Sequence, residues 1–221
     1  MVAISLTEKS CRICAAAYGS TASAEYDRPW LQSPDYLAFA SIGALVPGWS
    51  LVFPKNHYLN LARDFTTDAF WSFARRAHEV VEAQFGRAVV FEHGAQHENS
   101  ATGCGTDHAH MHIVPLTFSL VDAAKDFDHS IIWRRCKASE VNDTAEGNEY
   151  LFVSDTFNGA ETEGQIAVLQ TGRSQFFRRV IASKLGCPVE FDYKFHRFES
   201  TAVATARTLR ATAQGTRAAA A

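Results

Sequence analysis

The chain has 221 residues, of which 47% are hydrophobic and 20% charged. This composition supplies a packed core and excludes a wholly disordered chain. The formal net charge of -3 and a pI near 6.3 give no electrostatic reason to expect a nucleic acid partner. The chain has no run of roughly 20 apolar residues and does not start like a signal peptide, so we expect a cytoplasmic protein without a membrane partner.

Cys11 and Cys14 are the first notable feature along the chain. In a reducing compartment such a CxxC pair is typical of a metal site or a redox pair, and two ordinary reduced cysteines are the alternative. The other three cysteines are isolated in the sequence and are expected to be buried thiols: Cys104, Cys136 and Cys187.

The next segments predict a hairpin, a helix and two strands. Apolar residues at 36–43 and 49–54 flank a Val-Pro-Gly turn, which indicates two paired strands. Residues 67–85 carry apolar side chains at helical spacing, with Thr66 or Thr67 as the N-cap and Gly86 as the stop. Residues 88–92 indicate a short buried strand. A loop rich in small polar residues follows over 94–106, and residues 108–116 indicate the next strand.

The rest of the chain is less regular. Residues 149–154 and 165–169 indicate strands, and the tail from residue 201 has few large apolar residues, which predicts a flexible or marginally helical segment. Residues 174–185 indicate a helix whose inward side chains are Phe177, Val180, Ile181 and Leu185. Because the strands follow one another with one clear helix between them, we expect an α+β fold with a mostly antiparallel sheet.

Three histidines alternate with apolar residues in Asp107-His108-Ala109-His110-Met111-His112-Ile113. In a strand, alternate side chains share a face, so the histidines would line one side about 6.5–7 Å apart while their neighbours enter the core. The polar side of an edge strand is the alternative interpretation. The preceding loop, with glycines at 103 and 105, favours a site where backbone N–H groups approach a phosphate.

The segment resembles the His-φ-His-φ-His-φ-φ signature of the histidine triad (HIT) family, in which φ is apolar. Upstream, Pro47-Gly48-Trp49-Ser50-Leu51-Val52-Phe53-Pro54-Lys55-Asn56-His57 is similar to that family's strand followed by Pro-Lys-x-His. The order of elements also matches, over about residues 10–118. The resemblance implies a HIT-like antiparallel sheet with one main helix in residues 1–120. A C-terminal α/β extension over 121–200 would pack on this core, followed by the tail, 201–221.

The resemblance also implies a two-step displacement at phosphorus. The central histidine, His110, would attack and form a covalent phosphohistidine-type intermediate, which water or another acceptor then releases. His112 would contact the phosphate or the leaving group, and His108 completes the triad. Backbone N–H groups would stabilise the charged oxygens from Gly103, Cys104, Gly105 and Thr106. Triad proteins commonly pair through the helix and an edge strand, so a homodimer is expected.

Some triad proteins, and the related galactose-1-phosphate uridylyltransferases, complete a zinc site from a CxxC pair and two histidines. The matching positions here imply a structural Cys2His2 site for Zn²⁺ formed by Cys11, Cys14, His57 and His108. Zinc so placed would fix the start of the triad strand and leave His110 free.

The sequence departs from the family pattern around the expected substrate. Ser41, beside Ile42, stands where an acidic residue usually holds the ribose hydroxyls, and Cys104-Gly105 replaces the usual Gln-Ser. Glu92 and His93 follow the buried strand where an asparagine is common. We count Ser41, Ile42, Glu92 and His93 as candidate substrate-binding residues, although the last two fit strand-end residues facing water equally well.

The late helix either covers the pocket with Gln175, Arg178 and Arg179 or, the interpretation we favour, presents a solvated basic face.

We therefore expect a nucleotide hydrolase or nucleotidyltransferase, with a nucleotide or phosphorylated small molecule as its partner. A divergent enzyme acting on a phosphorylated or adenylylated metabolite is the second possibility, and a non-catalytic nucleotide-binding protein the third. The presence of His110 favours an enzyme. Ser41 lacks the anion that grips a ribose diol, and Glu92 would repel a polyphosphate, so a less charged substrate such as a nucleoside phosphoramidate is favoured.

Overall fold

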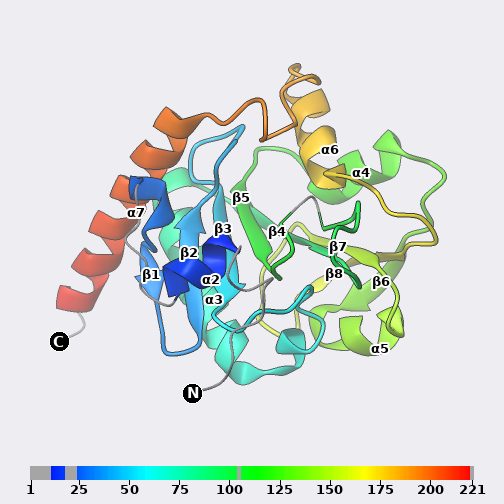
Figure 1. The fold of residues 1–221 in the computed structure, drawn as a ribbon, viewed down its shortest axis with the longest axis horizontal. Coiled ribbons are helices and arrows are strands. Elements are labelled where there is room, and N and C mark those ends of the chain that lie inside the picture. The colour runs from blue at the N-terminus through cyan, green and yellow to red at the C-terminus, as the bar shows by residue number, and fades with distance from the viewer. Residues whose placement is uncertain (1–10, 18–23, 104–105, 220–221) are drawn as a thin grey trace.

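A computed structural model of the chain describes residues 11–17, 24–103 and 106–219. In these residues the strands form one eight-stranded sheet in the order β1-β2-β3-β5-β4-β7-β8-β6, and all neighbouring strands are antiparallel (Figure 1). The strands are β1 Leu31–Gln32, β2 Tyr36–Ala40, β3 Ser50–Pro54, β4 Ala88–Gly94, β5 Met111–Pro115, β6 Arg134–Lys137, β7 Tyr150–Ser154 and β8 Glu163–Val168. The antiparallel sheet with helices confirms the predicted α+β class.

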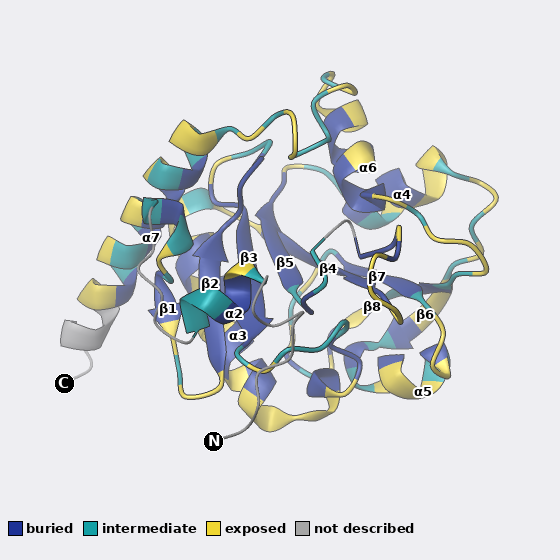
Figure 2. Cartoon of the chain, in the orientation of Figure 1, coloured by how far each residue is buried: buried dark blue, intermediate teal, exposed yellow. Residues whose placement is uncertain are grey.

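Helices cover both faces of this sheet. They are α2 Arg12–Ala17, α3 Asp68–Phe85, α4 Leu120–Phe127, α5 Val141–Ala145, α6 Phe176–Lys184 and α7 Glu199–Ala219, with short 3-10 turns η1 Glu25–Asp27, η2 Asp64–Thr66 and η3 Ala138–Glu140. One buried cluster joins the sheet to α3, α5 and α7, and a second joins its other face to α2, α4 and α6. Figure 2 shows the buried strands between helices whose outer faces are exposed. Among the described residues, no helix combines the length and apolarity that crossing a bilayer requires.

Strand β4 contributes side chains to the hydrophobic clusters on both faces of the sheet. Its alternating side chains place Ala88 and Val90 in the cluster under α3, while Val89 and Phe91 enter the cluster under α4 and α6. Alternate residues of a strand point to opposite faces, so a strand covered on both sides has apolar residues at nearly every position. All seven residues of β4 are buried.

The predicted hairpin and main helix are confirmed. Strands β2 and β3 pair with Ala38 opposite Val52. Thr67 is the N-cap of α3, where its hydroxyl accepts the N–H of Phe70, and Gly86 ends the helix with a φ of +85°.

The triad strand begins later than the sequence predicts, at Met111 instead of His108. Residues 106–110 are irregular because their backbone groups bond outside the sheet. The N–H of His108 donates to the carbonyl of Thr106 at 2.7 Å, and the N–H of Ala109 donates to that of Tyr58 at 2.6 Å. The strict alternation expected for the three histidines therefore holds only from His110 onward.

The residues after 120 continue the same sheet, because β7 pairs with β4 and β8 and β6 follow. Helix α4 and strand β6 were not predicted. The tail is a regular helix, α7, rather than a frayed segment. Its buried residues lie along one face of the helix and all but the leucine are small, which lets α7 lie close on α3 and β2: Ala202, Thr205, Ala206, Leu209 and Ala213. Leu185, expected to face inward, is 42% exposed at the end of α6.

Candidate active site and metal centre

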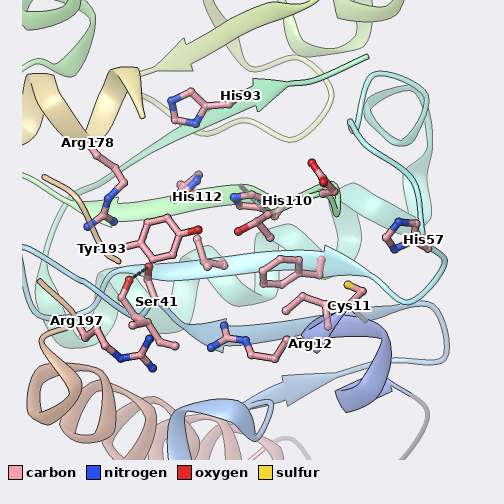
Figure 3. Close-up of a pocket in the computed structure, with 16 residues that line it drawn as sticks. Cys11, Arg12, Ser41, His57, His93, His110, His112, Arg178, Tyr193 and Arg197 are labelled. Atoms are coloured by element: carbon pink, nitrogen blue, oxygen red, sulfur yellow. Dashed lines mark hydrogen bonds between the residues drawn. The ribbon is translucent and has the colours of Figure 1, made fainter. Parts of the chain in front are cut away.

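A cavity of about 420 Å³ opens on the face of the sheet that carries α4 and α6 (Figure 3). The first half of the chain lines it with Ser41, Ile42, Leu51, Phe53, His57, His93, Thr106, Asp107, His110 and His112. The N-terminal segment adds Cys11, Arg12 and Ile13, and the last third of the chain adds Arg178, Tyr193 and Arg197. Two of the three triad histidines, at 110 and 112, thus face one cavity.

His110 is held in one tautomer by the backbone. Its Nδ1 lies 2.8 Å from the carbonyl oxygen of His108. Because a carbonyl only accepts, Nδ1 carries the proton and Nε2 carries the lone pair. Burial lowers the pKa of His110, which keeps the imidazole neutral at pH 7. The ring also stacks on Phe53, with centroids 5.2 Å apart. The residue therefore presents a fixed, neutral Nε2, the form of histidine that acts as a nucleophile.

His112 is held in the opposite tautomer by Trp49. The indole Nε1–H donates to His112 Nδ1 at 2.9 Å, so the proton of His112 lies on Nε2. That Nε2 is buried and has no hydrogen-bond partner in the described part of the chain. Burial, followed by the neighbouring His110, holds the pKa of His112 well below its ordinary value. A buried N–H without a partner beside a nucleophile suits an anionic oxygen. The two rings lie closer than an extended strand spaces them, with centroids 4.7 Å apart.

His93 forms part of the pocket wall beside His112, and the centroids of the two rings lie 5.8 Å apart. The N–H of Phe177, at the start of α6, donates to His93 Nε2 at 3.3 Å, which leaves the proton on Nδ1. Burial lowers the pKa of His93 to about 3, with smaller contributions from His110 and Arg178. The neutral ring connects α6 to the pocket.

Glu92 does not line the pocket, contrary to its place among the candidate substrate-binding residues. It precedes His93 in β4, so the two side chains point to opposite faces of the sheet. Its carboxyl oxygens accept the N–H of Leu61 at 2.6 Å and the hydroxyl of Tyr150 at 2.5 Å. Burial raises the pKa of Glu92 to about 8. This residue serves the core under α3 and carries no charge toward a phosphate.

The remaining candidates divide into two groups. Ser41, Ile42 and Thr106 line the pocket, and the Ser41 hydroxyl donates to the carbonyl of Ile42 at 3.1 Å. Gly103 is buried and does not line the pocket, and its carbonyl accepts the N–H of Thr106 at 3.0 Å. The two residues between them, at 104 and 105, lie outside the described residues.

The four predicted metal ligands come together beside the pocket. The ligand atoms of Cys11, Cys14, His57 and His108 all lie within 4.8 Å of one another. Sulfur–nitrogen separations are 3.4 Å from Cys11 to His108, 3.3 Å from Cys14 to His57 and 3.7 Å from Cys14 to His108, each measured to Nδ1. The four residues are therefore close enough to bind a metal ion.

These distances also suit a tetrahedral site. A tetrahedral ion with ligand distances of about 2.3 Å to sulfur and 2.0–2.1 Å to nitrogen places such ligand atoms roughly 3.6 Å apart. His108 Nε2 lies 2.8 Å from the carbonyl oxygen of Pro54, so Nε2 carries the proton and Nδ1 is left to coordinate. Burial lowers the pKa of His108 to about 4, which keeps the ligand neutral.

His108 thus belongs to the group of four candidate metal ligands and does not line the pocket. Its ring faces the cysteines while its carbonyl orients His110, so one residue links the candidate metal ligands to the candidate nucleophile.

The structure corrects the interpretation of the late helix. Arg178 is only 3% exposed and lines the pocket, whereas Arg179 is exposed, so the solvated basic face applies to the second residue alone. Arg178 precedes the buried Ile181 by three positions, and this helical spacing was a signal for its inward orientation. Trp49 was also not predicted as a site residue, because its contact with His112 depends on the pairing of β3 with β5.

Comparison with known proteins finds matches that involve the first half of the chain. A solved structure that matches is the crystal structure of a Hit-like protein involved in cell-cycle regulation from Bartonella henselae, with an unknown ligand. It is 22% identical over 48% of this chain and 79% of that chain, with a TM-score of 0.39. No curated protein matches. The family model of the HIT domain matches residues 25–119, which contain the hairpin, α3 and all three triad histidines.

Proposed function

We propose that the protein is a nucleotide hydrolase or nucleotidyltransferase that acts at phosphorus through a covalent intermediate on His110. The observation that carries this proposal is the 2.8 Å hydrogen bond from His110 Nδ1 to the carbonyl of His108. That bond directs the proton away from Nε2 and the lone pair toward the cavity. A binding protein has no need of a nucleophile prepared in this way. The HIT domain match over residues 25–119 supports the same class of activity.

In the first step, His110 Nε2 forms a bond to phosphorus as the bond to the leaving group breaks. His112 Nε2–H donates to a phosphoryl oxygen as negative charge builds on it, and the Trp49 indole keeps that proton in place. In the second step, water or another acceptor attacks phosphorus and the phosphorus–nitrogen bond breaks, which returns His110 to its starting state.

We further propose that the ion held by Cys11, Cys14, His57 and His108 is Zn²⁺. Two thiolates and two neutral imidazoles form a donor set that zinc favours, and four protein ligands leave no open position for substrate. The ion would serve as a structural cross-link between the N-terminal segment, the loop after β3 and the segment before β5.

Mass spectrometry after a rapid quench tests the proposal. The protein is incubated with a library of nucleotides and nucleotide conjugates, then digested. We expect an adduct on the peptide that contains His110, of a mass that identifies the transferred group. His110→Ala should lose the adduct and turnover, whereas the exposed His129→Ala should retain both. Full turnover by a correctly folded His110→Ala protein would contradict the mechanism, and binding without an adduct would favour the non-catalytic alternative.

An enzyme acting on a phosphorylated or adenylylated metabolite is a second candidate for the same chemistry. Ser41 lines the pocket and brings no anion for a ribose diol, and the last third of the chain builds part of the wall. The expected repulsion of polyphosphates by Glu92 does not hold, because that carboxyl lies on the other face of the sheet. Ser41 therefore remains a reason to expect a weak hold on a ribose diol, and Glu92 gives no reason to favour a less charged substrate.

A further inference from the structure

Part of the pocket wall comes from residues after the HIT domain match, which ends at residue 119. Arg178 belongs to α6, and Tyr193 and Arg197 lie in the segment between α6 and α7. This segment is fastened to the turn after β2, because the N–H of Gly43 donates to the carbonyl of Arg197 at 2.5 Å. Figure 3 shows Arg178, Tyr193 and Arg197 on the side of the pocket away from His57. The wall therefore has a defined position relative to the triad histidines.

Arg178 is the most constrained of these side chains. Its Nε donates to the carbonyl of Phe191 at 2.8 Å, and one terminal nitrogen donates to the carbonyl of Gly43. Its guanidinium lies 4.8 Å from the ring centroid of Trp49 and 5.7 Å from that of Tyr193. These four contacts fix the orientation of the guanidinium, and the half-buried carboxylate of Asp192 also interacts with it electrostatically. A buried cation held in this way at a pocket wall is suited to an anion.

The other two arginines contribute less charge. Arg197 pairs with Glu199 at 2.7 Å, and Arg12 pairs with Asp27 at 3.0 Å. Both side chains are close to half exposed, where ion pairs and single charges are screened by water. They form the rim of the pocket, and Arg178 is the cation of its interior.

Arg178 lies on the His112 side of the pocket. The indole of Trp49 contacts Arg178 through its face and His112 through its Nε1–H, so one ring links the two. An anion bound by Arg178 would therefore occupy the His112 side of the pocket. It would be a neighbour of the phosphoryl group at His110 and not that group itself.

We propose that the pocket takes a substrate with two anionic groups, the phosphoryl group attacked by His110 and a neighbouring phosphate or carboxylate held by Arg178. This inference rests on the proposed function and names the class of substrate. Without a second anion, Arg178 would serve only to join α6 to the turn after β2. The two roles differ in one measurable property, which is the preference of the pocket for dianionic over monoanionic ligands.

Calorimetric titration of the full-length protein with stable phosphonates measures that preference. Methylphosphonate has one anionic group, phosphonoacetate and 3-phosphonopropionate add a carboxylate at two spacings, and methylenediphosphonate adds a second phosphonate. None can react with His110, because the carbon–phosphorus bond is not cleaved. We expect at least one of the three longer ligands to bind tenfold or more tightly than methylphosphonate, and which of them does so separates a carboxylate from a phosphate.

We call the affinity for the tightest of the three longer ligands, divided by that for methylphosphonate, the affinity ratio. Arg178→Gln should reduce this ratio to about two or less. Arg179→Gln removes the same charge one residue away, on the exposed face of α6, and should retain the ratio. If Arg178→Gln fails to fold, Arg178→Lys keeps the charge but loses the planar fork, and the ratio should fall at least threefold. Equal affinities for all four ligands, no binding of any, or a ratio unchanged in a folded Arg178 variant would overturn the inference. A His110 adduct without the preference contradicts this inference alone, and the preference without an adduct contradicts the proposed enzyme alone.

Discussion

Replacing Glu92 by glutamine should make the protein more stable at neutral and alkaline pH. Glu92 is fully buried under α3, and its two oxygens accept the N–H of Leu61 and the hydroxyl of Tyr150. Glutamine has the same shape. Its oxygen keeps the bond from Leu61, and its NH₂ donates to the Tyr150 oxygen. The protonated carboxyl can likewise present a donor to the Tyr150 oxygen, so the substitution removes the titrating proton and leaves the packing and the bond from Leu61 in place.

The size of the effect follows from the pKa. Burial raises the pKa of Glu92 from 4.5 to about 8. Between these values the unfolded chain loses the proton while the folded chain keeps it, so the free energy of unfolding falls as pH rises. At 1.36 kcal/mol for each pH unit, the loss reaches about 5 kcal/mol by pH 8 and is constant above it. Below about pH 4.5 the group is protonated in both states and the loss disappears.

Urea unfolding followed by tryptophan fluorescence, at pH values from 5 to 8.5, measures this loss. The wild-type free energy of unfolding should fall across the series, and the curve of Glu92→Gln should be flatter by several kcal/mol. Glu98→Gln, at an exposed position, should follow the wild type. Glu92→Ala should be less stable than Glu92→Gln at every pH, because it leaves two buried donors without partners at about 1–3 kcal/mol each. Parallel curves for the wild type and Glu92→Gln would refute the reasoning.

Four further outcomes are expected. Cys14→Ser should lose close to one zinc ion per chain and lower the unfolding temperature, as measured by metal analysis and calorimetry; protein that contains no metal when purified without chelators would argue against the zinc site. Trp49→Phe should lower kcat about 10- to 100-fold with unchanged metal content, because His112 loses the donor that fixes its tautomer, and an unchanged kcat would exclude that role. His110→Ala should abolish turnover while its unfolding temperature stays near that of the wild type. Light scattering should give twice the 24.4 kDa chain mass, and a monomer mass would rule out the homodimer.

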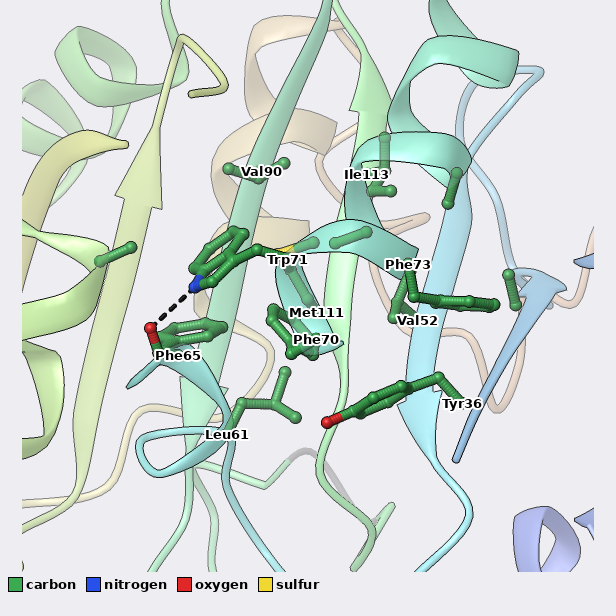
Figure 4. Packing of buried hydrophobic residues seen from close by; sticks show 14 of the residues in the cluster. Tyr36, Val52, Leu61, Phe65, Phe70, Trp71, Phe73, Val90, Met111 and Ile113 are labelled. Carbon is green, nitrogen blue, oxygen red and sulfur yellow. Dashed lines mark hydrogen bonds between the residues drawn. The ribbon is translucent and has the colours of Figure 1, made fainter. Parts of the chain in front are cut away.

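The main helix shows what a local pattern determines. Buried side chains on one face of α3, among them Phe70, Trp71 and Phe73, pack against the sheet as their helical spacing predicts (Figure 4). Thr67 and Gly86 mark its ends through caps that depend only on neighbouring residues. By contrast, β6 has three charged residues among its four and becomes a strand because β8 lies beside it. No periodic apolar pattern within the segment indicates that pairing.

The residues of the site also differ in whether a local sequence pattern could identify them. The histidines at 110 and 112 could be located from their own strand, and the four metal ligands from their spacing and the family resemblance. Alternation along β4 also contained the evidence that Glu92 and His93 cannot both face one pocket. Arg178 and Trp49 could not be assigned from a local pattern alone, because their roles depend on contacts between segments more than 60 residues apart.

The pairing of β7 with β4 has a consequence for how the molecule unfolds. Strand β4 is bonded on one side to β5, which carries His112, and on the other to a strand from the last third of the chain. Separating these parts would break one ladder and expose a buried edge, so we expect a single cooperative transition and late hydrogen exchange for the β4 amides. Truncation after residue 119 would leave that edge open to pairing with other chains. His110 and Arg178 therefore belong to one folding unit.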